Sequence, residues 1–130
     1  MPGWTCAAGS TLLIPSGAQG NHLFIVLNNP ANFVGYPPQS CVSVCICSIR
    51  KGPYDETCLV AVGEHPFVVQ PSYVSYRHGR IDPCAHLKNL VDEQTIFPNT
   101  DVSAGLLGRI QAGLKASPQT PNYLKQLQSA

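Results

Sequence analysis

Glycine and proline divide residues 10–77 into short apolar runs, and this pattern limits the fold more than any other feature. The chain of 130 residues contains 11 glycines and 12 prolines. The apolar runs lie at 10–17, 21–30, 41–49, 57–62 and 67–77. Pro71 interrupts the last run, because proline cannot donate a hydrogen bond to the ladder of a central strand. Short extended runs joined by such turns predict about five β-strands in a small barrel or a strongly bent sheet.

Helical periodicity replaces this pattern in the second half of the chain. Residues 83–93 begin with proline and place most of their apolar side chains on one side of a helix. Residues 100–117 carry the clearest helical stripe, which consists of Val102, Leu106, Leu107, Ile110 and Leu114. We expect Thr100 or Asp101 to cap the start of this helix and Pro118 to end it.

The composition fits one globular domain over residues 1–130. Apolar residues make up 44% of the chain, which excludes a disordered protein. Charged residues make up only 12%, against roughly 25% in a typical soluble domain. A surface with so few charges suggests that a partner or a second copy covers part of it. No run approaches the roughly 20 apolar residues of a membrane span, so no membrane contact is expected.

Six cysteines raise the question of disulfides or a metal site. Cys41, Cys45 and Cys47 share one face of a single predicted strand, where they are more typical of small apolar filler than of cross-links. Their spacing lacks the Cys-x2-Cys pairs of zinc sites, and Cys84-x-His86 is not a known ligand pair. The N-terminus has neither the basic start nor the apolar run of a secretory signal. We therefore expect reduced thiols, no metal or other cofactor, and a cytoplasmic protein.

The net charge of +1 provides no overall field that would attract a polyanion. Nucleic acid would have to bind at local clusters, of which the sequence has two. Arg50 and Lys51 form the first, and Arg77, His78 and Arg80 form the second. Both clusters are equally compatible with solvated ends of turns.

The order of segments resembles the PemK/MazF family of toxin endoribonucleases over roughly residues 10–117. "NHLFIVLNN" stands where the family has an apolar strand, and "VSVCICS" ends in Ser48 where the family's next long strand ends in Thr or Ser. "QPSYVSYRHGRI" and "VSAGLLGRIQAGL" match the family's later strand and its helix. The resemblance implies an SH3-like barrel with a C-terminal helix. It also implies a metal-independent endoribonuclease that cuts single-stranded RNA, forms a homodimer and is covered by an antitoxin protein.

The sequence departs from this family at one important position. The family's catalytic arginine would fall at His22 or Leu23, and neither is arginine. Ser48 matches the family's catalytic Thr or Ser. Either the chemistry is rebuilt around histidine, or the barrel has a different task.

Metal-free RNA cleavage requires a base, an acid and a positive group on the phosphate oxygens. Histidine suits acid and base roles because its ordinary pKa lies near neutrality. We expect His22 and His65 to be the acid and the base, and Ser48 and Arg77 to bind phosphate. The competing interpretations are that His65 caps a turn, that His22 starts a strand and that Ser48 ends one.

Further residues are candidates for substrate binding. Arg80 is an alternative to Arg77 for bidentate phosphate binding, and Arg50 belongs to the other basic cluster. Tyr73 and Tyr76 can stack on bases, although at least one of them is expected in the core. Two other functions remain open: a non-catalytic SH3-like module that binds a peptide or nucleic acid, and an accessory subunit of a defence or mobile-element system.

Overall fold

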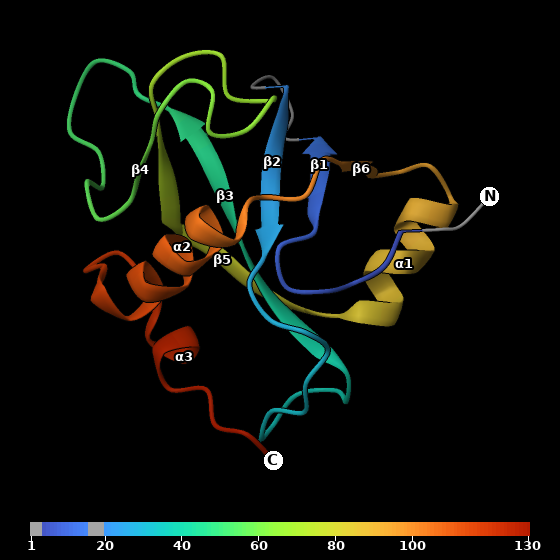
Figure 1. Cartoon of the computed structure of the whole chain (residues 1–130). Coiled ribbons are helices and arrows are strands. Elements are labelled where there is room, and N and C mark those ends of the chain that lie inside the picture. The colour runs from blue at the N-terminus through green and yellow to red at the C-terminus, as the bar shows by residue number, and fades with distance from the viewer. Residues whose placement is uncertain (1–3, 16–19) are drawn as a thin grey trace.

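A computed structural model describes residues 4–15 and 20–130, and these residues form a curled antiparallel sheet with three helices (Figure 1). The strands are β1 (Thr11–Pro15), β2 (Asn21–Val26), β3 (Ser40–Ser48), β4 (Leu59–Val60), β5 (Ser72–Pro83) and β6 (Phe97–Asn99). The helices are α1 (Cys84–Asp92), α2 (Ala104–Ala116) and α3 (Asn122–Lys125). The prediction of a mainly β fold with C-terminal helices is confirmed.

The strands follow the order β4-β5-β3-β2-β1-β6, and each neighbouring pair is antiparallel. β4 and β6 therefore form the two edges. β4 has two residues, where the sequence predicted a strand over 57–62. β6 was not predicted, since Pro98 lies at its centre. The end of the first predicted run, at residues 16–17, lies outside the described residues.

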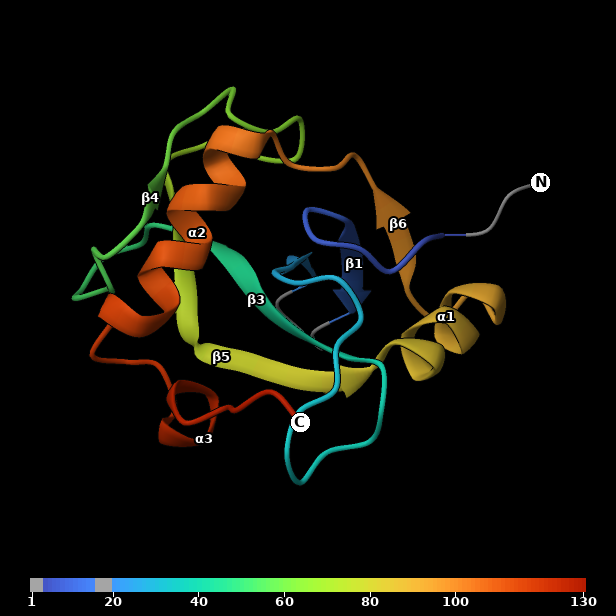
Figure 2. The ribbon, with the colours of Figure 1, turned by 60° about the horizontal axis from the view of Figure 1, so that its bottom comes forward.

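The alternation predicted for β3 is confirmed, and it defines the two faces of the sheet. Val42, Val44 and Ile46 are buried in the main core, which α2 closes from inside the curl. Figure 2 shows α2 lying across the inner side of the sheet near β3 and β5. Cys45 and Cys47 project from the outer face. The same outer face also carries the second core, around Leu12, Val26 and Cys41, which α1 covers.

Tyr76 on β5 connects the sheet to α2. Its side chain is fully buried, and its hydroxyl donates a hydrogen bond of 2.8 Å to the Ile110 carbonyl. The ring lies against Gly113, where a Cβ atom would meet the Tyr76 hydroxyl oxygen at 2.0 Å. The sequence offered Tyr76 as a base-stacking residue. This proposal is wrong, because the ring is enclosed between β5 and α2.

A bulge bends β5 in its middle. Ser43 is paired with Arg80 and Cys45 with Ser75, so the single residue Val44 faces the four residues 76–79. Gly79 permits this bend, because a Cβ there would lie 2.7 Å from the Leu124 side chain and 3.1 Å from the Tyr76 carbonyl. The bulge turns the exposed Arg77 and His78 away from the core.

The start of α2 differs from the prediction. Ser103 is the N-cap, and its hydroxyl accepts a hydrogen bond from the Leu106 amide. Thr100 lies three residues earlier, and its carbonyl instead accepts a hydrogen bond from the Thr11 hydroxyl at 2.8 Å. The predicted apolar stripe is confirmed, because Ile110 and Leu106 are buried in the main core.

The expectation that all cysteines are reduced is wrong. Cys6 in the N-terminal segment and Cys84 at the start of α1 form a disulfide. Sequence spacing could not show this pair, since 78 positions separate the two residues. Burial raises the pKa of the nearby Cys41 thiol to about 12, and Asp82 adds to the rise. At neutral pH Cys41 therefore stays protonated and does not attack the disulfide. Within the described residues no helix combines the length and the apolar character required to cross a bilayer.

Candidate functional site

A hollow of about 490 Å³ lies where β2, β3 and β5 meet the loops at 49–58 and 61–71. We call it the His22 hollow. Its polar lining includes His22, Cys47, Ser48, Arg50, Lys51, Gln70 and Tyr73. Four residues that the sequence singled out thus share one cavity: His22, Ser48, Arg50 and Tyr73. Its volume lies in the range typical of small-molecule sites.

The strand register brings three of these side chains into one row. Leu23 is opposite Ile46, so the preceding residue, His22, is next to the position of Cys47. Cys47 is in turn opposite Tyr73. Directly opposed residues project from the same face of a sheet, with Cβ atoms about 4.5–5.5 Å apart. His22, Cys47 and Tyr73 therefore form a continuous polar row on the outer face.

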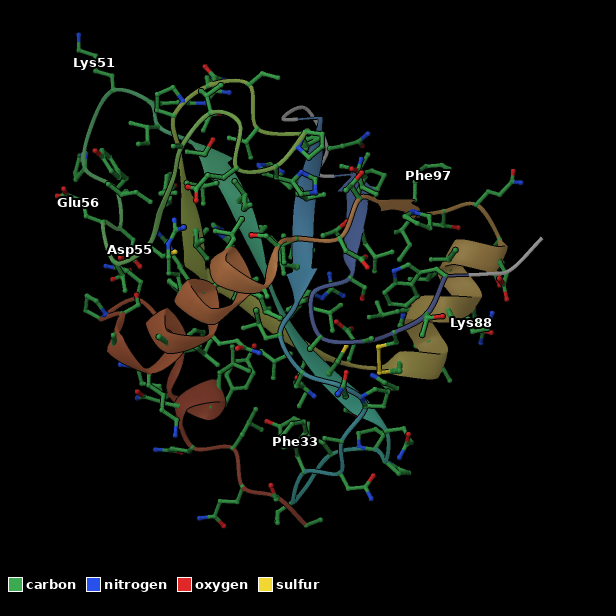
Figure 3. The ribbon with its side chains drawn as sticks, in the orientation of Figure 1. Phe33, Lys51, Asp55, Glu56, Lys88 and Phe97 are labelled. Carbon is green, nitrogen blue, oxygen red and sulfur yellow. A yellow bond between two sulfur atoms is a disulfide. The ribbon has the colours of Figure 1, made fainter. Side chains whose placement is uncertain are left out.

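Hydrogen-bond donors and positive charge surround this row. Ser48 accepts a hydrogen bond of 2.8 Å from the Gln70 side chain, so its own hydroxyl hydrogen is directed elsewhere and can donate to an anion. Arg50 and Lys51 are exposed in the loop after β3. Figure 3 shows Lys51 at the outer end of that loop, directed away from the body of the molecule.

Two tyrosines separate the His22 hollow from a second one. The rings of Tyr54 and Tyr73 lie 5.5 Å apart with a tilt of 35°. Both rings also line the second hollow, of about 220 Å³, together with the exposed Arg77 and His78. The two hollows are thus neighbours on one surface, and each offers an aromatic ring and a basic side chain.

Arg109 and His65 help to hold the loop at 61–71, which forms one wall of the His22 hollow. Arg109 of α2 donates to both carboxylate oxygens of Glu64 and, at 2.9 Å, to the Leu59 carbonyl. The hydrogen bond from Arg109 lowers the pKa of Glu64 to about 2. His65 makes the second contact. The Phe67 amide donates to its Nδ1 at 3.0 Å, so its Nε2–H donates to the Thr100 carbonyl.

The structure does not bring His65 together with His22. The His65 side chain is only 2% exposed, both ring nitrogens are engaged with the backbone, and it does not line the hollow. The proposed acid–base role of His65 is therefore corrected to a structural one. A structural role, as the cap of a turn, was the competing interpretation of His65 in the sequence analysis.

Arg80, the other predicted phosphate ligand, is already paired with a carboxylate of the protein. Its guanidinium donates to both carboxylate oxygens of Asp82, at 2.7 and 3.1 Å, and lies 5.9 Å from the centre of the Phe24 ring. Since Asp82 already occupies its bidentate face, Arg80 is a poor phosphate ligand. Arg77 keeps its predicted place near the site, although it lines the second hollow and not the first.

Cys47 is a candidate site residue that sequence reasoning missed. Its sulfur lies 3.9 Å from that of Cys45. A hydrogen bond from the Cys45 thiol lowers the pKa of Cys47 to about 7, against the effect of burial, and Tyr73, Ser75 and Arg50 add to the lowering. The same contact and burial raise the pKa of Cys45 far above its ordinary value. The parity of β3 placed Cys47 on the outer face, but only the register with β2 and β5 puts it beside His22 and Tyr73.

We expect Cys47 to be the fastest-reacting thiol of the disulfide-intact protein. A pKa near 7 makes more of this thiol a thiolate at neutral pH than of an ordinary cysteine, so iodoacetamide should modify it roughly three- to fivefold faster than an unperturbed cysteine. Peptide mass spectrometry after timed alkylation measures this, and the rate should rise with pH around a midpoint near 7. The buried Cys58 is the internal control. A Cys47 rate no higher than that of Cys58 would contradict the prediction.

The arrangement combines a proton-carrying imidazole and thiol, a hydroxyl donor, basic side chains and stacking rings. Such a set can bind a phosphodiester and its bases and can move protons at it. Comparisons with protein-family models, with curated proteins and with solved structures gave no match.

Proposed function

We propose that the His22 hollow binds single-stranded RNA and cleaves it without a metal ion. The observation that carries the proposal is the row of His22, Cys47 and Tyr73 within one hollow that Ser48 and Arg50 also line. The resemblance of the sequence to the PemK/MazF family implies the same activity.

Each part of the substrate has a partner in this hollow. Arg50 and the Ser48 hydroxyl bind the phosphate oxygens and stabilise the charge that develops in the transition state. Tyr54 and Tyr73 stack on adjacent bases, and stacking on aromatic rings does not require a particular base sequence. Because a base must leave a duplex before it can stack in this way, the preferred substrate is single-stranded.

Cleavage uses the ribose 2′-OH as the nucleophile on the adjacent phosphorus. A base removes the 2′-OH proton, the bond between phosphorus and O5′ breaks, and an acid protonates O5′. The products are a 2′,3′-cyclic phosphate and a 5′-OH end. We assign the two proton transfers to His22 and Cys47, which takes the place that the sequence gave to His65.

The finer fold assignment, the toxin role and the partners belong to the same proposal. A curled antiparallel sheet followed by α2 supports an SH3-like barrel of the PemK/MazF type. Exposed apolar side chains lie at β4 and on the wall of the hollow, at Leu59, Val62, Phe67 and Val69. An antitoxin protein or a second copy that covers them would also close the RNA site.

A non-catalytic binding module is the second candidate. Two observations favour it: neither His22 nor Leu23, where the family's arginine would fall, is arginine, and Arg80 is held by Asp82. Such a module would bind RNA in the same hollow and leave it intact.

The test is cleavage of a long single-stranded RNA in EDTA, together with RNA binding by fluorescence anisotropy. We expect wild-type protein to leave 5′-OH ends, which polynucleotide kinase labels directly. His22→Ala should lower the cleavage rate by about 10²- to 10⁴-fold with little change in binding. Arg50→Ala should weaken binding. His86→Ala is the matched control, since this exposed histidine lies on α1, away from the hollow.

The outcomes separate the candidates. Binding that depends on Arg50, without cleavage at high protein concentration, would replace the ribonuclease by the binding module. A wild-type protein that neither binds nor cuts RNA would overturn both.

A further inference from the structure

Three cysteines from three distant segments meet next to α1. The sulfur atoms of Cys6, Cys41 and Cys84 all lie within 4.8 Å of one another. They come from the N-terminal segment, β3 and the first residue of α1. Figure 3 shows the disulfide as a yellow bond beside α1. Cys41 is 1% exposed, and its sulfur is the one of the three that does not belong to the disulfide.

The spacing of the three sulfurs suits a metal ion. Thiolates bind Zn²⁺ at about 2.3 Å, so two of them on one ion lie roughly 4 Å apart. The observed limit of 4.8 Å is close enough for small side-chain rotations to bring all three onto one ion. The side chains of Cys41 and Cys84 are already held in place by the surrounding core of Leu12, Val26 and Leu87.

The charges near the cluster also permit a cation. Asp82 is paired with Cys41 across the strands and is 8% exposed. Arg80 neutralises its carboxylate through two hydrogen bonds. Three thiolates and one Zn²⁺ would leave a single net negative charge at the site.

We propose that Cys6, Cys41 and Cys84 form a redox-gated site for a thiophilic divalent cation, Zn²⁺, with a water molecule as the fourth ligand. A dithiol reductant donates two electrons and two protons to the Cys6–Cys84 disulfide, and is itself converted to a disulfide. The two thiols formed in this way and the Cys41 thiol, which is already free, then lose their three protons as they bind the ion. Disulfide and ion are mutually exclusive, since the disulfide sulfurs are not thiolate ligands.

The two states attach the N-terminal segment to the sheet in different ways. The disulfide joins it to the start of α1 alone, whereas the ion joins it to α1 and β3 together. The cluster is independent of the proposed ribonuclease. Cys41 lies six residues from Cys47 along β3, a distance of about 20 Å at the usual rise of a strand.

The test uses the full chain, reduced with a phosphine under anaerobic conditions and titrated with Co²⁺ and Zn²⁺. Thiolate-to-cobalt charge-transfer absorption reports sulfur ligation, and competition with a chelator gives the Zn²⁺ affinity. We expect one ion per reduced wild-type chain and none per oxidised chain. Cys41→Ser should weaken binding about a hundredfold or more. Cys58→Ser should bind like wild type, since Cys58 is a buried free cysteine outside the cluster.

Cys41→Ser is the decisive variant, because it removes the third ligand and keeps the disulfide. Circular dichroism of its oxidised form checks that it folds. Zn²⁺ should raise the thermal midpoint of reduced wild type and not that of reduced Cys41→Ser. Equal Zn²⁺ affinity for Cys41→Ser and wild type would overturn the proposal, as would a reduced wild-type chain that binds no ion.

Discussion

Replacing Gly113 with alanine is expected to lower the free energy of unfolding by about 2–4 kcal/mol. The new Cβ would lie 2.0 Å from the Tyr76 hydroxyl oxygen and 2.5 Å from Cζ of the ring. Tyr76 is fully buried and has no space to retreat, so either α2 moves outward or the ring leaves its position. Both movements break the hydrogen bond from the hydroxyl to the Ile110 carbonyl.

Gly108→Ala and Gly105→Ala are the matched controls for this effect. Both glycines lie in the same helix, and a Cβ at either position would meet nothing within 4 Å. Alanine favours a helix over glycine by about 1 kcal/mol, so these two variants should be slightly more stable than wild type. Urea unfolding followed by circular dichroism measures all three. A Gly113→Ala variant as stable as the controls would show that α2 does not pack on Tyr76 as described.

Replacing His65 with alanine is expected to cost about 2–4 kcal/mol of stability and to leave the proposed RNA cleavage by the folded protein largely intact. The ring is buried, and its loss would leave the Phe67 amide without its acceptor and remove a donor from the Thr100 carbonyl. Urea unfolding gives the stability. RNA cleavage at low temperature, divided by the folded fraction, gives the intrinsic rate. His86→Ala, an exposed histidine, should change neither quantity.

This variant also decides between the two interpretations of His65. If it served as an acid or a base, His65→Ala would lose cleavage as strongly as His22→Ala while keeping its stability. That result would contradict the position of the ring in the structure.

The sequence predicted those parts of the fold that local patterns determine. The alternation in β3 placed Val44 and Cys45 on opposite faces of the sheet. Pro71 was predicted to interrupt a strand, and β5 begins at the next residue. The bulge in β5 was not predicted, because it lies where Leu124, from far along the chain, packs close to Gly79, and no local pattern shows this approach. β6 was missed for a similar reason, since only its pairing with β1 makes a segment with a central proline a strand.

The candidate site was predictable in part. His22, Ser48, Arg50 and Tyr73 were chosen by residue type and by their places at strand ends, and they line one hollow. The choice failed where another partner already occupies the polar group, two residues away at Arg80 and far along the chain at His65. The His65 ring is hydrogen-bonded to the Thr100 carbonyl, 35 residues further along the chain, and no pattern of sequence spacing shows this contact.

The shape of the two sheet edges restricts how copies of this chain can associate. β4 offers only two residues, and Pro98 removes a backbone donor from the centre of the three-residue β6. Each of these two terminal strands is therefore too short to template a long strand from another molecule. Association of two copies through β4 or β6 is therefore disfavoured, and side chains on the faces and loops are the more suitable contact surfaces.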